Sequence, residues 1–403
     1  MTDTRSLSGT LEPRQLALAL LAMSTGAFAI GTTEFATMGL LPQIAESFGA
    51  TLPQAGNLVS AYALGVVVGA PVIMLAVPRV SRTRLLVLLA VGLAVGNALS
   101  ALAPGLGSAL AARFLAGVPH GAYFGLTAVV AARVAPPQRR ARSVSLVMVG
   151  LTVATTLGVP ISTALGQQLG WRSMYWFVTV VALVTVLAIL RWVPPVAAEP
   201  GANARRELTA LASPQVWLAV GIGGIGFGGM FALYSYITPI TTEAGGIAIG
   251  HVPALLALFG GGMTLGTLLG GRLADRSVLG AVAVGLGAMA LSLAAFGLWA
   301  TVPVRTVVLA VLVATSSAII GPALQTRLLD VARQGPSLGA ALHHSAMNIG
   351  NAVGAWLGGV VIAAGLGYLA PAWAGAGLAV AGLLITAASV VLDRRQPVRE
   401  PAR

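Results

Sequence analysis

Residues 266–276 read GTLLGGRLADR, a glycine-rich apolar run that ends in an arginine, an aspartate and a second arginine. A long apolar segment precedes this run, and another begins directly after it. The same alternation of long apolar segments and short polar gaps continues along the whole chain. Only 8% of the residues are charged and 57% are hydrophobic, whereas charged side chains make up about a quarter of a soluble domain. Lipid must therefore solvate most of this chain.

The arginines lie in alternate gaps. The chain has no lysine, and 20 of its 23 arginines fall in the first tail and in every second gap. The other gaps hold only Arg172 and Arg305, and Arg113 lies inside an apolar segment. Because basic residues collect in cytoplasmic loops, the pattern predicts a multi-pass membrane protein with both termini in the cytoplasm.

The formal charge of +12 does not indicate a nucleic-acid partner, since the arginines are spread one cluster per gap instead of forming one basic face. We expect them to set the topology and to contact anionic lipid headgroups. The absence of cysteine excludes disulfides, thiolate chemistry and cysteine-based metal sites.

The apolar segments are long enough to span a membrane as helices, which needs about 20 residues each. We predict an all-α membrane protein with about twelve transmembrane helices in two pseudo-symmetric six-helix bundles. The predicted bundles cover residues 1–193 and 215–403, joined by a cytoplasmic linker at 194–214. The predicted spans are 15–40, 55–77, 84–103, 107–132, 143–166, 171–193, 215–241, 251–271, 278–300, 304–326, 337–363 and 368–391.

An internal repeat supports the division into halves. A shift of 197 residues places Gly69 on Gly266, Arg79 on Arg276 and the run 169–171 on 366–368. Such a repeat predicts two bundles related by an axis along the membrane normal, with the working cavity between them near the midplane.

The opening stretch resembles the cytoplasmic-loop motif G-x-L-A-D-R of the major facilitator superfamily. The resemblance implies that Gly271, Asp275 and Arg276 form a latch that holds one conformation, since a carboxylate can bind arginines and a helix N-terminus of the other bundle. In the equivalent run of the first half, Pro78 stands where the family has aspartate, while Arg79 and Arg82 are retained. Alternatively, these arginines only set the topology.

The fourth apolar segment contains Arg113, at the position of the arginine in the superfamily's fourth-helix motif R-x-x-x-G. A buried arginine is costly in a membrane and is a functional candidate, and the resemblance implies proton coupling. Alternatively, Arg113 extends to the outer membrane surface. His120, Tyr123 and Phe124 follow it and are candidates for the wall of a substrate cavity, with a structural role as the alternative.

The fifth apolar segment contains Gly158 and Pro160 and looks like the antiporter motif of exporters in this superfamily. A proline kink flanked by small residues is physically suited to a hinge or seal. That it indicates export is implied by the resemblance alone.

Glu34 is the one carboxylate within the predicted spans. It precedes Pro42 by eight residues, close to the spacing of the acid in the first-helix motif of drug/proton antiporters. A carboxyl group in a medium of low dielectric constant can alternate between charged and neutral forms, which suits a proton carrier. Alternatively, Glu34 is a solvated group at the outer boundary, because a straight helix from Arg14 reaches about 30 Å there.

In the second half, polar and aromatic residues interrupt otherwise apolar spans and are predicted to line a pocket for a solute of mixed polarity. These residues are Tyr234, Tyr236, His344, Asn348 and Asn351. His344, Asn348 and Asn351 share one helical face. The equal alternative is that these side chains serve only helix packing or interhelical hydrogen bonding.

Taken together, these motifs resemble the twelve-span drug/proton antiporter branch of the superfamily, nearest to its arabinose-efflux-permease and chloramphenicol-efflux members. The resemblance implies a monomer that exports a small organic solute or drug by alternating access, using the proton gradient and no cofactor. A sugar or nucleoside exporter or a uniporter of the same fold is the alternative. A membrane-embedded metalloenzyme is a remote one, because no H-E-x-x-H motif is present, and we expect no metal site and no enzymatic activity.

Overall fold

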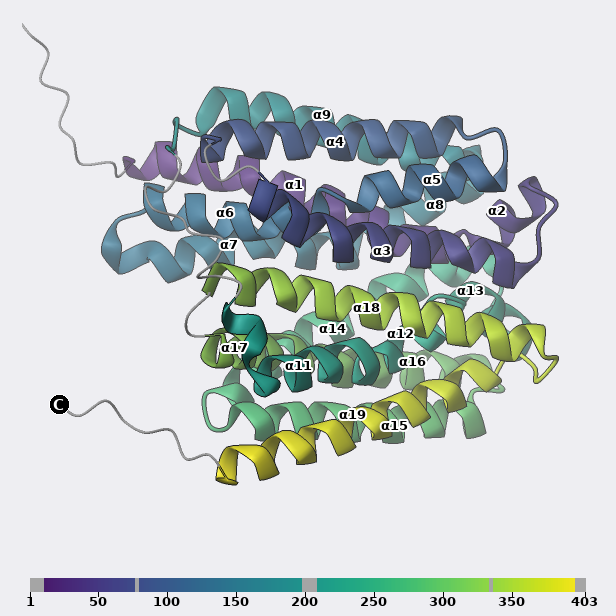
Figure 1. Cartoon of the computed structure of the whole chain (residues 1–403). Helices are drawn as coiled ribbons and strands as arrows, with labels where there is room; N and C mark the ends of the chain where they lie inside the picture. Colours follow the sequence, from purple (N-terminus) through teal and green to yellow (C-terminus); the bar gives the residue numbers. More distant parts are fainter. Residues whose placement is uncertain (1–10, 77–79, 198–208, 333–335, 396–403) are drawn as a thin grey trace, which may run out of the picture.

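The long helices lie side by side along one direction (Figure 1). The computed structural model describes residues 11–76, 80–197, 209–332 and 336–395. Arg79 and much of the predicted linker therefore lie outside the described residues. Within these ranges the chain is helical and contains no β-strand.

The helices of the first half run from α1 to α9: α1 (Pro13–Gly39), α2 (Leu41–Ser47), α3 (Leu52–Ala76), α4 (Arg82–Leu102), α5 (Leu106–Gly117), α6 (His120–Val134), α7 (Arg140–Val153), α8 (Val159–Leu169) and α9 (Arg172–Trp192). Those of the second half are α11 (Pro214–Gly221), α12 (Gly228–Tyr234), α13 (Ile237–Pro239), α14 (Val252–Ala274), α15 (Val278–Trp299), α16 (Pro303–Ala318), α17 (Ile320–Val331), α18 (Pro336–Ala363) and α19 (Ala370–Arg395).

Some spans are built from consecutive helices. The π-helical turns Ala154–Gly158 and Ile222–Gly226 interrupt two of the spans, and a third π-helical turn, Ile240–Ala244, follows α13. The 3₁₀ turns Pro137–Arg139, Thr209–Ala212 and Ile249–His251 precede α7, α11 and α14. Counted as continuous spans, the described residues contain 12 helices long and apolar enough to cross a membrane. The predicted fold class and number of spans are therefore confirmed.

Large apolar side chains are exposed along the outside of the spans, where lipid replaces water as the solvent. Examples are Leu291 at 74% and Leu187 at 66% exposure. Burial of apolar surface gives little drive for helix association in lipid, so close contacts between small residues are needed instead. A side chain at Gly69 of α3 would overlap the carbonyl of Val118, and one at Gly266 of α14 would overlap the carbonyl of Thr315. These glycines, related by the 197-residue shift, allow equivalent helix pairs to pack closely in both halves.

The two halves occupy separate regions of Figure 1, with α1–α9 above and α11–α19 below. They meet where α3 packs against α18 and where α14 packs against α8 and the π-helical turn at Ala154–Gly158. The exact domain boundaries remain a prediction.

At one end the halves are held together. There, Oγ1 of Thr238 donates a hydrogen bond to the carbonyl of Gly39 at 2.9 Å, and Nε2 of Gln167 donates to the carbonyl of Ile249 at 3.1 Å. Closer to the middle, Oγ of Ser60 donates to the carbonyl of Ala352 at 3.2 Å. We call the end near Gly39 the closed end. The opposite end, where α1 begins and α19 ends, is the open end.

Candidate functional site

Glu34 lies in the interface between the halves. It is on α1, five residues before that helix ends, and is 7% exposed. Its Oε1 accepts a hydrogen bond from Nδ2 of Asn351 on α18, at 3.3 Å. This burial excludes the alternative of a solvated group at the membrane boundary. The carboxyl group instead joins a helix of the first half to a helix of the second.

Arg113 is buried beside the same part of α1. It is 1% exposed, so it does not extend to the membrane surface. Nη1 donates to Oγ1 of Thr33 at 2.9 Å and Nη2 donates to the carbonyl of Thr33 at 3.3 Å. The guanidinium group also lies over the ring of Tyr62, 4.2 Å from its centroid. Arg113 therefore binds the residue directly before Glu34.

The structure thus brings the two predicted proton-coupling candidates together without an ion pair between them. A buried charge is costly unless other groups compensate it. Here Thr33 receives the Arg113 bond while its own Oγ1 donates to Oδ1 of Asn97 at 2.5 Å, and Glu34 interacts electrostatically with Arg113. Residues Thr33, Tyr62 and Asn97 were not identified from the sequence. Their signal is weak, because each is a single polar side chain in an apolar span.

A cavity of about 660 Å³ lies between the halves towards the open end. Phe124 and His344, both predicted for it, lie in its wall with nearly parallel rings 5.0 Å apart. Among the described residues, no acidic side chain and no arginine lines the cavity. The lining comes from α6, α7, α14, α17 and α18: Phe124, Gly125, Ala128, Val129, Val144, Ser145, Met148, Val149, Thr152, Thr267, Leu268, Gln325, Ala340 and His344.

Three further predicted residues, His120, Asn348 and Asn351, lie beside this cavity or between it and Glu34. The ring of His120 is 5.3 Å from that of Phe124 and 5.9 Å from that of His344, and its Nδ1 is 3.1 Å from the hydroxyl of Tyr62. Asn348 donates from Nδ2 to the carbonyl of His344 at 3.0 Å. Asn351 lies one turn further and reaches Glu34. A continuous group of polar side chains therefore runs from the cavity to Glu34.

The three predicted tyrosines do not line this cavity. The hydroxyl of Tyr123 donates to the carbonyl of Met23 at 3.0 Å, so this side chain is directed into the first half. Tyr234 packs against Phe35 at a centroid distance of 5.5 Å. The hydroxyl of Tyr236 donates to the carbonyl of Ala355 at 3.0 Å. Tyr234 and Tyr236 belong to the packing near the closed end.

The antiporter-like segment contains a π-helical turn directly before Pro160. Pro160 has no N–H for the carbonyl of Thr156 four residues earlier, and the N–H of Val159 bonds the carbonyl of Ala154 five residues back. A side chain at Gly158 would meet Thr32 of α1. Gly158 and Pro160 therefore lie where the first half's α1 and the second half's α14 meet this segment.

Of the predicted latch residues, Asp275 and Arg276 are accessible and Arg82 is buried. Asp275 and Arg276 are exposed just after α14 ends, and neither forms an ion pair within the described ranges. Gly271 is half-buried with open space around it. Arg82 begins α4, is 7% exposed, and donates from its main-chain N–H to the carbonyl of Val196 at 2.8 Å.

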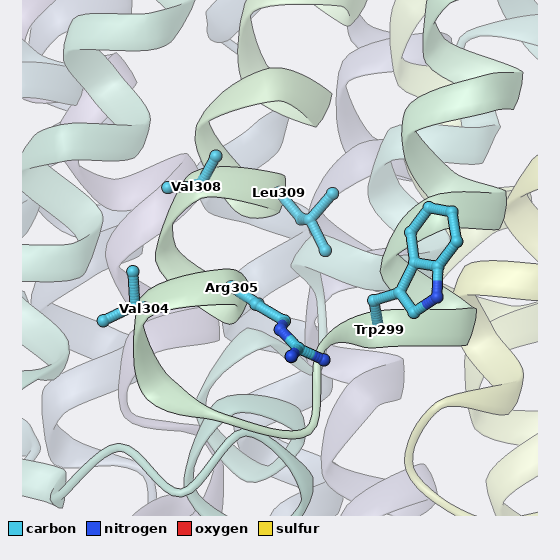
Figure 2. Close-up of a pocket in the computed structure, with 5 residues that line it drawn as sticks. All are labelled: Trp299, Val304, Arg305, Val308 and Leu309. Atoms are coloured by element: carbon cyan, nitrogen blue, oxygen red, sulfur yellow. The ribbon is translucent and has the colours of Figure 1, made fainter.

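A second hollow lies on the outside of the second half, away from the interface. It has a volume of about 500 Å³ and is lined by Trp299, Val304, Arg305, Val308 and Leu309. Figure 2 shows the Arg305 side chain between Val304 and Trp299. Val304 is 75% exposed, so this hollow opens directly to the surroundings. It is a shallow surface feature and contains no residue predicted for the site.

In the part of the chain that the structure describes, no three His, Cys, Asp or Glu side chains are grouped as they are around a metal ion.

Comparison with known proteins shows that the chain is similar to membrane transport proteins over most of its length. The chain is 38% identical to the inner membrane transport protein YdhP of Escherichia coli (strain K12) over 378 residues, covering 94% of this chain and 96% of that protein. It is 31% identical to a chloramphenicol resistance protein of Streptomyces lividans over 374 residues, covering 92% and 95%.

Among solved structures, a bacterial homologue of the human lysosomal transporter Spinster, in an inward-facing and unoccupied conformation, superposes with a TM-score of 0.72. It is 18% identical and covers 97% of this chain and 100% of that one. The family model of the Major Facilitator Superfamily matches residues 23–337. The buried polar interface between two groups of helices and these matches together place the chain in the Major Facilitator Superfamily, and it is a multi-pass membrane transporter.

Proposed function

We propose that this transporter exports a small organic solute from the cytoplasm in exchange for protons, by alternating access. One observation carries the proposal: the buried Glu34 carboxyl is hydrogen-bonded across the interface to Asn351. This hydrogen bond must break when the two halves separate at this point. The protonation state of the carboxyl group is therefore coupled to the separation of the halves. A ligand that binds one conformation better than the other shifts the population towards it, and a proton on Glu34 is such a ligand.

Arg113 supports this role. Ionised Glu34 is compensated by the nearby guanidinium group, while neutral Glu34 leaves Arg113 bound only to Thr33 and stacked on Tyr62. The two protonation states therefore differ in how the charges of the interface are balanced. Such a difference is what an exchanger needs to separate proton binding from solute binding.

The cavity indicates an uncharged or weakly polar solute. Its wall offers the Phe124 ring, methyl groups and a few hydrogen-bonding side chains such as Ser145, Thr152 and Gln325. The similarity to a chloramphenicol resistance protein makes an amphenicol the first solute to test. Nucleosides and sugars are the next solutes to test, because the cavity wall also offers hydroxyl and amide groups that can form hydrogen bonds with them.

We further propose that the protein lies in the inner membrane of a bacterium with both termini in the cytoplasm. The arginine distribution supports this orientation. The open end then faces the cytoplasm, and the cavity admits solute from that side. A reporter fused after Arg399 is expected to be cytoplasmic and one fused near Gly245 to be external; the reverse pattern contradicts the orientation.

The central experiment uses the full-length chain in proteoliposomes with an imposed pH gradient and labelled chloramphenicol. The parent is expected to accumulate the label against its gradient. Glu34→Gln removes the titrating group with little change of shape, so accumulation is lost while downhill exchange remains. Glu243→Gln changes an exposed carboxylate after α13 and is the matched control, expected to behave as the parent. Uphill transport by Glu34→Gln at the parent rate would eliminate Glu34 as the coupling site.

A further inference from the structure

Helix α18 carries an unusual concentration of buried polar atoms that have no partner in the protein. They are Nδ1 of His343, Oγ of Ser345, Oδ1 of Asn348 and Oδ1 of Asn351. In a membrane such atoms are expensive, because the surrounding lipid offers no hydrogen bonds. Four such atoms lie within fewer than three helical turns. We therefore expect another molecule to form hydrogen bonds with some of them.

Three residues of this stretch lie in a row. His344, Asn348 and Asn351 follow the spacing i, i+4 and i+7, which places them on one face of the helix. His344 lines the cavity and Asn351 donates to Glu34. Asn348 lies between them and is 3% exposed. We call these three residues the α18 row.

The first half supplies the opposite wall. Nδ1 of His120 is 3.1 Å from the Tyr62 hydroxyl, and the His120 ring also contacts His344. The Tyr62 ring lies under Arg113. Among the titratable or charged side chains of the surrounding helices, Arg113 of α5 acts electrostatically on Glu34, and Glu34 in turn acts on Tyr62 of α3 and Tyr234 of α12. Polar groups of both halves therefore border one path from the cavity to Glu34.

We propose that the α18 row holds a short chain of water molecules, along which a proton passes between Glu34 and the cavity. This inference rests on the proposed function, in which Glu34 carries the proton. The O–H bond of neutral Glu34 breaks, the proton binds to a neighbouring water, and the carboxylate keeps the electron pair. The asparagines do not titrate. Their Oδ1 atoms accept hydrogen bonds from the waters and keep them in line.

The row explains how a proton reaches the open end although Glu34 itself lies nearer the closed end. Asn348 is the residue on which the path depends most, because it separates the cavity wall from the Glu34 contact. Its Nδ2 is already bonded to the carbonyl of His344. Its Oδ1 is therefore the atom that must accept a hydrogen bond from a water molecule.

The test measures proton loss from Glu34 directly and needs no transported solute. The full-length protein in lipid vesicles is subjected to a rapid increase in pH, and the C=O stretch of the neutral carboxyl group is followed by infrared difference spectroscopy. Glu34→Gln identifies which part of the signal belongs to Glu34. Asn348→Leu keeps the branching and the number of heavy side-chain atoms but cannot bind water, and it is expected to slow the loss of that signal by about tenfold or more.

Two matched variants complete the design. Asn348→Ser keeps a short polar side chain and is expected to restore a rate near that of the parent. Ser345→Ala removes another unpartnered buried atom, which lies outside the arc of the row, about 60° around the helix from Asn348 and about 100° from His344, and it should leave the rate unchanged. If Asn348→Leu does not insert into the membrane, His344→Phe tests the same row, because the ring is retained without its nitrogens.

Each outcome has a distinct meaning. Parent-like proton loss in Asn348→Leu, or in His344→Phe where that variant replaces it, overturns the water path. Slowing in Ser345→Ala by the same factor also overturns it, because the effect is then not specific to the row. If the parent shows no carboxyl signal that Glu34→Gln removes, then Glu34 does not titrate, and the proposed function fails instead of the path.

Discussion

Arg113 and Glu34 are linked through α1, because Arg113 binds Thr33, the residue directly before Glu34. Glu34 and Arg113 could be selected from the sequence because a charge within an apolar span needs a reason to be there. Their contacts with Asn351, Thr33 and Tyr62 depend on how each helix is rotated about its axis. Hydrophobic periodicity defines that rotation poorly in spans that are apolar on nearly every side. Tyr123 illustrates the limit, since its hydroxyl binds Met23 inside the first half and not a cavity.

Arg113→Lys is expected to impair coupling without preventing membrane insertion. Lysine keeps the charge but cannot donate in parallel to Oγ1 and the carbonyl of Thr33, nor stack its head group flat on Tyr62. Each hydrogen bond lost from a charged group costs about 1.5–3 kcal/mol, so the melting temperature in detergent should also fall. The control is Arg305→Lys in the exposed hollow of Figure 2. Equal uphill transport by the parent and Arg113→Lys would show that the charge alone is sufficient.

At the scale of helices, the sequence predicted the number and approximate limits of the spans, because their length follows from the thickness of the membrane. It did not predict the π-helical turns within them. Pro160 and Gly158 indicated a bend, but the change from i→i+4 to i→i+5 bonding at Ala154–Gly158 depends on neighbours. There the main chain of Thr155 approaches Gly260 of α14, a contact between segments more than 100 residues apart.

Close helix packing can be tested with glycines in different surroundings. A side chain at Gly69 would overlap the Val118 carbonyl, so Gly69→Val should force α3 away from α5 at a cost of about 1–3 kcal/mol. Gly287 lies within α15 with open space around its Cα, and Gly287→Val is the control. Thermal unfolding followed by fluorescence-detected size exclusion should show a lower melting temperature only for the first variant. Similar melting temperatures would mean that this helix pair has room to adjust.

The end of α14 offers a separate test of the proposed latch. Asp275 is exposed and has no ion pair within the described part of the chain, so the latch is not engaged at this residue in the conformation described. If it engages when the open end closes, Asp275→Asn should slow transport while membrane insertion stays normal. Transport by Asp275→Asn at the parent rate would leave the surrounding arginines with a topological role only.

For the whole molecule, the internal repeat predicted two halves with a cavity between them. It could not predict which end of the interface is closed. Both end states of a transporter share one sequence, and their difference in free energy depends on a few contacts across the interface. In this structure those contacts include the bonds from Thr238 and Gln167, while Ser145 and Gln325 line the cavity near the open end.

Cross-linking can distinguish the two ends, since the chain contains no native cysteine. We expect Gln167→Cys with Ile249→Cys to react readily with a short bis-maleimide and to stop transport, because the closed end must separate in each cycle. Ser145→Cys with Gln325→Cys should react more slowly in the resting protein. Each single-cysteine variant controls for modification alone. A faster reaction of the Ser145–Gln325 pair would show that the opposite end is the closed one.

Three of the bonds between the halves end on main-chain carbonyls, those of Gly39, Ile249 and Ala352. A carbonyl is present whichever amino acid occupies the position. Mutations at the acceptor positions therefore remove no bonding atom, and the bonds themselves place no demand on the identity of the acceptor residue. At Gly39 the demand comes from packing instead, because a side chain there would overlap Thr163 and Leu256. The two halves can consequently diverge at different rates during evolution, with fewer compensating substitutions across the interface than paired side chains would require.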